Sequence, residues 1–288
     1  MEKKTRTTLR RINTKRITKA VKKLFIEANT VLGEDVVGAL THALSREESE
    51  TGKQVLQKII ENADIACRKK MPICQDTGLA IVFVELGQDI HIVGGELHAA
   101  IEEGVRQAYE EGYLRKSICD PLTRKNTTDN LPAIIHVDIV AGDRMKIIAM
   151  PKGGGSENVS AVKMLIPAAG IDGIKKFVLE TVEAAGANPC PPVIVGVGIG
   201  GSLEQACIIA KKALLRPVGE ANRIDERVEQ MEKELYQSVN NLGIGPAGLG
   251  GRVTALAVNI EMMPCHIASL PVAINIQCHV ARHKEITI

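Results

Sequence analysis

The chain has 288 residues, 45% of them hydrophobic, so it can bury a large core and is too apolar to be disordered. Its formal net charge is only +2, and it has no Trp, three Tyr and three Phe. We therefore expect no nucleic-acid partner and, since no apolar run approaches the roughly 20 residues of a membrane span, no membrane segment.

The N-terminal stretch is strongly basic. Residues 1–23 hold ten Lys or Arg and a single acidic residue, Glu2. A basic arm and an organelle-targeting segment are two interpretations of such a stretch. From residue 17 on, however, Ile17, Val21, Leu24 and Phe25 fall on one helical stripe, so we expect the basic residues to form its solvated face. The absence of a signal-peptide pattern and the odd number of cysteines, seven, favour a cytoplasmic protein.

Hydrophobic periodicity predicts the elements in chain order. The first seventy residues are expected to be helical, over residues 17–29, 34–47 and 52–70. Strands are then expected over residues 79–86, 133–140, 144–151, 191–199, 252–263 and 269–281, the second and third paired antiparallel through a turn at residues 141–144. Further helices are expected over residues 95–116, 161–170, 172–186, 202–215 and 224–242. The pattern predicts a mixed α/β (α+β) fold, residues 1–288, with a helical N-terminal part (1–70) packed on an α/β body with a mixed sheet (71–288).

A glycine fingerprint, Gly196-x-Gly198-x-x-Gly201, stands between an expected strand and an expected helix, which is the outline of a dinucleotide-binding turn. Glu220 lies about 20 positions further on, where such folds bind a ribose. The remainder of the chain, however, is expected to form a long charged helix and two strands rather than a series of βα units. A non-enzymatic nucleotide-binding module therefore remains only as an alternative.

Three cysteines differ from the others in their surroundings. Cys74, Cys190 and Cys278 each lie at an element boundary beside proline or polar residues, whereas Cys207 lies on an apolar helical stripe. The three are far apart in sequence and form no local metal-binding motif. Spacing alone thus leaves buried thiols and metal ligands both open.

Several longer sequence motifs are more specific than any of these patterns. They are "PICQDTG" (72–78), "KGGGSEN" (152–158), "NPCPPVIVGVGIGG" (188–201), "NLGIGPAGLGG" (241–251) and "PCHIASLPVAINIQC" (264–278). Together they resemble the class I, iron–sulfur-dependent fumarate hydratases, and most closely the separate α subunit of the two-subunit form, related to the L-tartrate dehydratase α subunit. The resemblance covers nearly the whole chain, in order, and implies a single fumarase α-type catalytic domain.

The resemblance implies a [4Fe-4S] cluster held by Cys74, Cys190 and Cys278. Three thiolates leave one iron open to act as a Lewis acid on the substrate. Single-chain members carry a cysteine where this chain has Leu270, which favours Cys278 as the ligand. Cys265 stands where a basic residue is expected. On this interpretation the proline-framed cysteine is a ligand and the glycine turn is scaffold.

The same resemblance implies the residues around the substrate. Asp76 is expected to serve in the catalytic base, and Gln75 to contact the substrate. Arg115 is expected to bind a carboxylate, Gly154 to offer backbone N–H groups, and His266 to contact the substrate. Without the resemblance, the simpler roles would be preferred: a turn cap for Asp76, a helix end for Arg115 and a loop position for His266.

The activity implied is the reversible hydration of fumarate to L-malate, a small dicarboxylate, with L-tartrate dehydratase α subunit as the alternative. Single-chain family members continue far beyond the point that matches Ile288, and that further region supplies catalytic groups. We therefore expect a separately encoded fumarase β subunit as a partner. We also expect an α homodimer that brings His266 near the site of the neighbouring subunit.

Overall fold

The computed structural model describes residues 9–223 and 225–288. Residues 1–8, part of the basic stretch, and Ile224, the expected first residue of the charged helix, lie outside the described residues. The chain forms two compact units, each containing helices and strands, as expected for a mixed α/β fold. Unit 1 comprises Met1–Val31, Ala66–Lys152 and Arg282–Ile288, and unit 2 comprises Leu32–Ile65 and Gly153–Ala281. In the described part of the chain, no helix is both long and apolar enough to cross a membrane.

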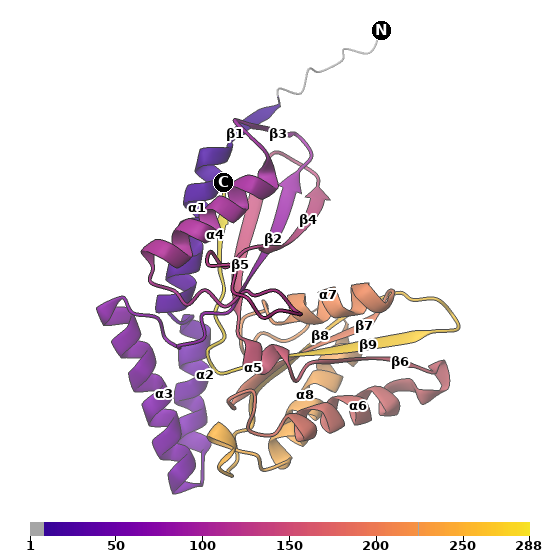
Figure 1. Cartoon of the computed structure of the whole chain (residues 1–288). Helices are drawn as coiled ribbons and strands as arrows, with labels where there is room; N and C mark the ends of the chain where they lie inside the picture. Colours follow the sequence, from indigo (N-terminus) through magenta and orange to yellow (C-terminus); the bar gives the residue numbers. More distant parts are fainter. Residues whose placement is uncertain (1–8, 224) are drawn as a thin grey trace. The chain divides into compact units, whose positions relative to one another are not determined.

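Unit 1 is built on a four-stranded mixed sheet in the order β10-β5-β2-β4, with a separate parallel pair, β1-β3. Its elements are β1 (Arg10–Asn13), α1 (Thr14–Thr30), β2 (Leu79–Gly87), β3 (Ile90–Val93), α4 (Leu97–Glu111), β4 (Ile134–Val140), β5 (Met145–Lys152) and β10 (Lys284–Thr287). Helices α1 and α4 lie side by side against the sheet (Figure 1). The core of unit 1 therefore lies between these two helices and one sheet face.

Helix α1 confirms the amphipathic interpretation of the N-terminal region. It begins after Asn13, whose side chain caps the first turn by accepting a backbone N–H bond. The stripe of Ile17, Val21, Leu24 and Phe25 is fully buried. Tertiary packing of this apolar face, more than helix propensity, stabilises the helix.

The expected antiparallel pairing of residues 133–140 with 144–151 is wrong. Strand β2 lies between β4 and β5, pairing parallel with β4 and antiparallel with β5. The sequence of β2, "LAIVFVELG", is an almost continuous apolar run that is mostly buried, and such a strand takes a central position. The β4–β5 connection crosses the end of β2, where the Gly87 N–H donates to the Arg144 carbonyl at 2.9 Å.

Unit 2 contains a second four-stranded mixed sheet, in the order β6-β9-β7-β8. Its elements are α2 (Glu34–Arg46), most of α3 (Glu50–Lys69), α5 (Gly154–Glu157), β6 (Ala161–Leu165), α6 (Gly170–Ala185), β7 (Val193–Gly200), α7 (Leu203–Ala213), α8 (Glu226–Asn241), β8 (Ala255–Met263) and β9 (Leu270–Gln277), with 3₁₀ turns at Pro167–Ala169 and Pro246–Gly248. Helices α6 and α8 pack on one sheet face and α7 on the other (Figure 1).

The glycine fingerprint lies mostly inside a strand. Gly196 and Gly198 are in the middle of β7, on the face that packs against α7. A Cβ atom on Gly198 would lie 2.1 Å from the Ala206 carbonyl oxygen, and one on Gly196 would lie 2.2 Å from that of Ala210. These glycines therefore let the helix approach the strand closely, rather than forming a phosphate-binding turn.

The expected helix over residues 161–170 is also wrong. Ala161–Leu165 forms the edge strand β6, paired antiparallel with β9 from Ala161 opposite Ile274 to Leu165 opposite Leu270. A 3₁₀ turn follows at Pro167–Ala169. Proline cannot donate to a helical ladder, so a helix across this segment would be broken there.

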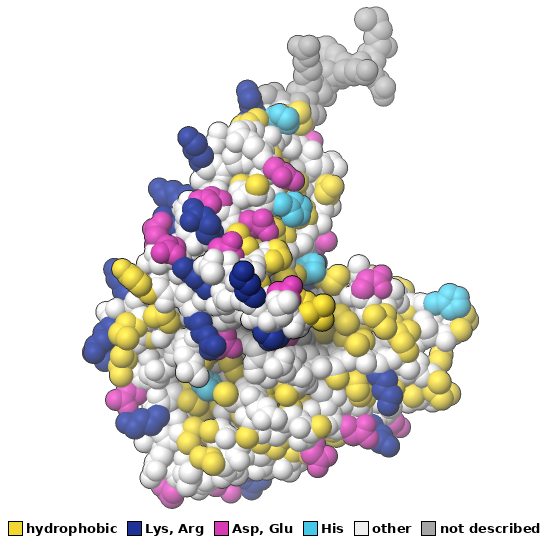
Figure 2. Space-filling view, viewed as in Figure 1, with side chains coloured by type: hydrophobic (Ala, Val, Ile, Leu, Met, Phe, Trp, Pro, Cys, Tyr) yellow, Lys and Arg dark blue, Asp and Glu magenta, His cyan; other side chains and the backbone are white. Residues whose placement is uncertain are grey.

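Exposed apolar side chains gather on the α7 side of unit 2. Val162 and Met164 of β6 are 42% and 48% exposed, and Leu203 of α7 is 51% exposed. Val162 pairs with Ala273, which packs under α7, so these side chains share that sheet face. Figure 2 shows hydrophobic side chains over α7, β9 and β6. We call Val162, Met164 and Leu203 the apolar patch.

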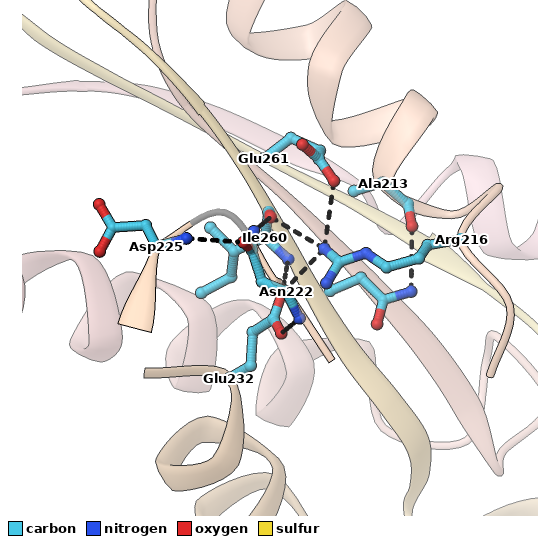
Figure 3. A network of polar contacts seen from close by, with 8 residues as sticks. Ala213, Arg216, Asn222, Asp225, Glu232, Ile260 and Glu261 are labelled. Atoms are coloured by element: carbon cyan, nitrogen blue, oxygen red, sulfur yellow. Dashed lines mark hydrogen bonds and ion pairs between the residues drawn. The ribbon is translucent and has the colours of Figure 1, made fainter. Parts of the chain in front are cut away.

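At the outer edge of β8, side chains instead of another strand form hydrogen bonds with the backbone groups. The Glu232 carboxylate accepts a bond from the Ile260 N–H at 2.7 Å and pairs with Arg216 Nη2 at 2.8 Å. Arg216 also donates to the Ile260 carbonyl at 2.9 Å and to Glu261 at 3.2 Å (Figure 3). Asn222 reaches the same carbonyl at 3.3 Å. Such covering prevents an edge strand from pairing with another chain.

Candidate functional site

The site residues predicted from sequence fall into two groups, one in each unit. Unit 1 holds Cys74, Gln75, Asp76 and Arg115, and unit 2 holds Gly154, Cys190, His266 and Cys278.

In unit 1, residues 74–78 form the last part of the loop between α3 and β2. The Asp76 N–H points to Cys74 Sγ at 3.4 Å, and the Gly78 N–H donates to Asp76 Oδ1 at 3.0 Å. This is an Asx-type turn, so Asp76 does cap a turn, and the turn fixes the direction of its carboxylate. Cys74 and Asp76 are half-buried and Gln75 is exposed. The loop thus presents a thiol, an amide and a carboxylate in three successive residues.

Three buried side chains that sequence reasoning missed hold this loop. The Tyr109 hydroxyl lies 2.8 Å from the Thr77 carbonyl oxygen and 2.9 Å from that of Gly78. Asn130 Nδ2 donates to the Gly78 carbonyl at 3.3 Å, and Arg282 Nη2 donates to the Asp76 carbonyl. The sequence offered only weak signals for two of them: Asn130 lies in the polar segment "NTTDNLP" (126–132), and Arg282 follows Cys278 by four positions.

Burial affects the ionisation of one of these side chains, Tyr109, and the hydrogen bonding of another, Arg282. It raises the pKa of the Tyr109 phenol far above its usual value, so the hydroxyl stays protonated and donates. Arg282 is only 3% exposed, and its Nε and Nη1 atoms have no hydrogen-bond partner among the described residues. A guanidinium in such a position retains donors for an anionic or water ligand.

Arg115 lies beside the same loop. Its side chain is exposed, while its carbonyl oxygen accepts a bond from Thr77 Oγ1 at 2.9 Å. Asn130 Oδ1 accepts bonds from the N–H groups of Ser117 at 2.7 Å and Ile118 at 3.2 Å. The fold therefore brings the segment that carries Arg115 and the loop that carries Asp76 together.

In unit 2, Cys190 and Cys278 lie at the same end of the sheet. Cys190 precedes β7, and Cys278 follows β9, which runs antiparallel to β7. Cys190 has a left-handed backbone with φ of 55°, which costs a non-glycine residue on the order of 1–3 kcal/mol. His279 Nδ1 lies 2.8 Å from the Cys190 carbonyl oxygen and helps to hold this conformation. His279 is a fourth residue that sequence reasoning missed, although it adjoins Cys278.

Gly154 lies at this end as well. It is the first residue of α5, whose Glu157 accepts a bond from Asn275 Nδ2 at 3.1 Å near the end of β9. A Cβ atom on Gly155 would lie 3.3 Å from the Asn188 carbonyl oxygen, two residues before Cys190. Unit 2 therefore brings Gly154, Cys190 and Cys278 to one end of its sheet.

His266 lies at the opposite end. It is exposed in the loop between β8 and β9, where its Nδ1 accepts a bond from the Ala268 N–H at 3.1 Å. Strand β9, which is labelled in Figure 1, separates it from Cys278 along the chain. Eight residues of strand span roughly 25 Å. Within unit 2, His266 is thus remote from both cysteines.

Two further cysteines have other environments. Burial raises the pKa of the Cys207 thiol, as expected for a cysteine packed on a helix face. Cys265 is exposed and its Sγ lies 3.2 Å from the Ser269 carbonyl oxygen. Over residues 9–223 and 225–288, no group of three or more His, Cys, Asp or Glu side chains forms a ready metal-binding set.

Comparison with known proteins gives a consistent family assignment. Residues 18–287 match the family model described as fumarate hydratase (fumerase). A Methanocaldococcus jannaschii protein provisionally named L(+)-tartrate dehydratase subunit alpha is 50% identical over 271 residues, covering 91% of this chain and 94% of that protein. The L(+)-tartrate dehydratase subunit alpha of Escherichia coli strain K12 is 32% identical over 277 residues, covering 95% and 91%. Because the family model spans nearly the whole chain and includes every candidate site residue, this chain belongs to the fumarate hydratase family.

Proposed function

We propose that this chain is the α subunit of a hydro-lyase that hydrates fumarate reversibly to L-malate. The observation that carries the proposal is the family match over residues 18–287. The grouping of the candidate residues supports it, since unit 1 gathers Cys74, Asp76 and Arg115, and unit 2 gathers Cys190 and Cys278.

A second candidate is L(+)-tartrate dehydratase. The names of the relatives at 50% and 32% identity favour it. Malate and tartrate differ by one hydroxyl group, and both lose water from a carbon next to one that bears an acidic C–H. The same set of acids, bases and carboxylate-binding groups therefore serves either reaction.

We infer that the cofactor is a [4Fe-4S] cluster held by Cys74, Cys190 and Cys278. The donor set fits, because iron–sulfur clusters are bound by cysteine thiolates and tuned by hydrogen bonds to sulfur. An N–H group already points at Cys74 Sγ, and Cys190 is held in a strained loop with an exposed thiol. When bound, such a cluster supplies an open iron as a Lewis acid for the substrate hydroxyl and carboxylate.

The side chains of this chain then take distinct roles. Asp76 accepts the carbon-bound proton as part of the catalytic base, and Gln75 contacts the substrate. Arg115 pairs with a substrate carboxylate through two parallel N–H bonds. Gly154 offers a backbone N–H group. His266 acts in the site of a second α chain, which is supported by its distance from Cys190 and Cys278 along the sheet.

The proposal includes two partner chains. A β subunit supplies the remaining carboxylate-binding and proton-transfer groups, which is supported by the word "subunit" in the names of the relatives. An α homodimer supplies His266 in trans. The apolar patch of Val162, Met164 and Leu203 supports burial of this face by a partner chain, because such patches mark interaction sites.

The proposed location is the cytoplasm. The odd number of cysteines and an oxidant-sensitive cluster are consistent with it.

The test is to purify this chain anaerobically, alone and with the candidate β chain, and to measure iron, sulfide, mass and dehydration of malate and L(+)-tartrate. We expect iron and sulfide in the α chain, an α homodimer that is nearly inactive alone, and malate dehydration when the β chain is added. A clear preference for tartrate would select the second candidate. A metal-free chain that binds NAD or ATP would overturn both in favour of a nucleotide-binding module, and full activity of the α chain alone would refute the β subunit.

A further inference from the structure

The carbonyl groups of the loop 74–78 need buried hydrogen-bond donors. Thr77 is 1% exposed, and the loop belongs to no helix or strand that would supply backbone donors. Gly78 has a φ of +81°, and a Cβ atom there would lie 2.7 Å from the backbone of Lys152, so the loop is pressed against β5. A buried carbonyl without a donor destabilises the fold, because its lost hydrogen bond to water is not replaced. The donor closest to both Thr77 and Gly78 carbonyls is the Tyr109 hydroxyl.

Tyr109 is a rigid support for that hydroxyl. Its side chain is 1% exposed on α4, and its ring lies against Phe25 of α1 with the ring centroids 6.1 Å apart. The neighbouring α4 residues Ile101, Val105 and Ala108 are also fully buried. The position of the hydroxyl is therefore fixed by the packing of α1 and α4 rather than by the loop itself.

The same arrangement connects the two predicted substrate-binding segments. Asn130 is fully buried and bonds the Gly78 carbonyl through Nδ2, while its Oδ1 accepts from Ser117 and Ile118, just after Arg115. Thr77 Oγ1 adds a bond to the Arg115 carbonyl. Through these bonds, the loop with Asp76 and the segment with Arg115 keep a fixed relative position.

We propose that Tyr109 is a positioning residue, which sets the direction of the Asp76 carboxylate and the Cys74 thiol by holding the Thr77 and Gly78 carbonyls. Its catalytic effect rests on the proposed hydro-lyase function, whereas its effect on the loop does not. In this role Tyr109 acts through Asp76 and Cys74 rather than on the reacting atoms. Misplacing a proton-transfer group by about 1 Å can cost on the order of 100-fold in rate, so removal of the hydroxyl matters although the ring remains.

The experiment compares Tyr109→Phe with two controls in the full-length chain. Tyr113→Phe removes the hydroxyl of a tyrosine that is 90% exposed, and Val105→Ala weakens the same α4 core without touching the loop. Asn130→Asp, which keeps the acceptor and loses the donor to Gly78, is a second test variant. The measurements are amide hydrogen exchange over residues 72–78 and the alkylation rate of Cys74 in the metal-free chain, and kcat and KM of the complex.

We expect Tyr109→Phe to speed exchange and Cys74 alkylation, and to lower kcat by about 10- to 100-fold with little change in KM. Tyr113→Phe should behave as the wild type. Each variant is measured at the same interval below its own Tm. If Val105→Ala then gives the same acceleration of exchange and alkylation as Tyr109→Phe, the positioning role is refuted. It is also refuted if Tyr109→Phe gives no acceleration. A wild-type complex without hydro-lyase activity would reject the proposed function alone, because exchange and alkylation still decide the role of Tyr109.

Discussion

The imidazole Nδ1 of His279 lies 2.8 Å from the carbonyl oxygen of Cys190. The residue beside one candidate thiol thereby holds the backbone of the other, although 190 and 279 belong to different loops. Because Cys190 has a left-handed φ of 55°, its backbone needs such support. The bond fixes the Cys190 loop against the end of β9, where Cys278 lies.

Replacing Cys190 should remove iron from the protein. In Cys190→Ser the soft thiolate is lost, and a serine hydroxyl is a poor ligand for an iron–sulfur cluster. We expect most of the iron and sulfide of the anaerobically purified chain to disappear, as measured by colorimetric analysis. Cys207→Ser, at a thiol packed on α7, is the control and should keep its iron. Unchanged iron content in Cys190→Ser would exclude this residue as a ligand.

Asp76→Asn should abolish most of the activity without unfolding the loop. The amide oxygen of asparagine can still accept the Gly78 N–H bond that Asp76 Oδ1 accepts at 3.0 Å. It cannot accept the substrate proton, so kcat should fall by about 10² to 10⁴. Steady-state kinetics of the complex measures this, with Asp172→Asn on the exposed start of α6 as the control. A kcat close to that of the wild type would show that the base lies elsewhere.

Gly198→Ala should destabilise unit 2. The new Cβ would meet the Ala206 carbonyl oxygen at 2.1 Å and push α7 away from β7, which costs roughly 1–3 kcal/mol. Gly38→Ala in α2 is the matched control: a Cβ there meets nothing within 4 Å, so it should stabilise by about 0.5–1 kcal/mol. Urea unfolding measures both. Equal stability of Gly198→Ala and the wild type would contradict the close packing of helix and strand.

Glu47 should make the free energy of unfolding depend on pH in the acid range. Burial alone would raise its pKa, but N–H donors from Arg252, Ser49, Val253 and Glu48 outweigh burial and lower the pKa below 4.5. A lowered folded-state pKa means that the stabilisation is complete above the unfolded value and is lost as pH falls through the folded one. Glu47→Gln should therefore cost about 1–3 kcal/mol near pH 7.

The check on Glu47 is urea unfolding at neutral pH and at successively lower pH. The difference between wild type and Glu47→Gln should shrink below pH 4.5, because the wild-type carboxylate then becomes protonated. Glu180→Gln, at an exposed pair with Lys176, should have little effect at any pH. A Glu47 difference that stays constant into acid would show that its charge does not stabilise the fold.

Hydrophobic periodicity predicted most of the helices and strands correctly. It failed where the structure depends on which strand pairs with which. The stripe of Ile17 to Phe25 predicted α1, because burial of a helix face follows a local 3.6-residue repeat. The same reasoning failed at residues 161–170, because an edge strand is selected by its partner β9 and not by its own repeat. It failed again for β4 and β5, since only the assembled sheet decides that β2 lies between them.

The candidate site likewise contains residues that the sequence indicates and residues whose role only the tertiary structure shows. The family resemblance pointed to Cys74, Asp76 and Arg115, because a resemblance is carried over position by position along the chain. Tyr109 carries no such signal, because it is part of an ordinary apolar helix stripe, and Asn130 is marked only by its loop segment, residues 126–132. Their role exists only because folding buries the carbonyls of Thr77 and Gly78, and a buried acceptor must find its donor wherever the tertiary structure supplies one.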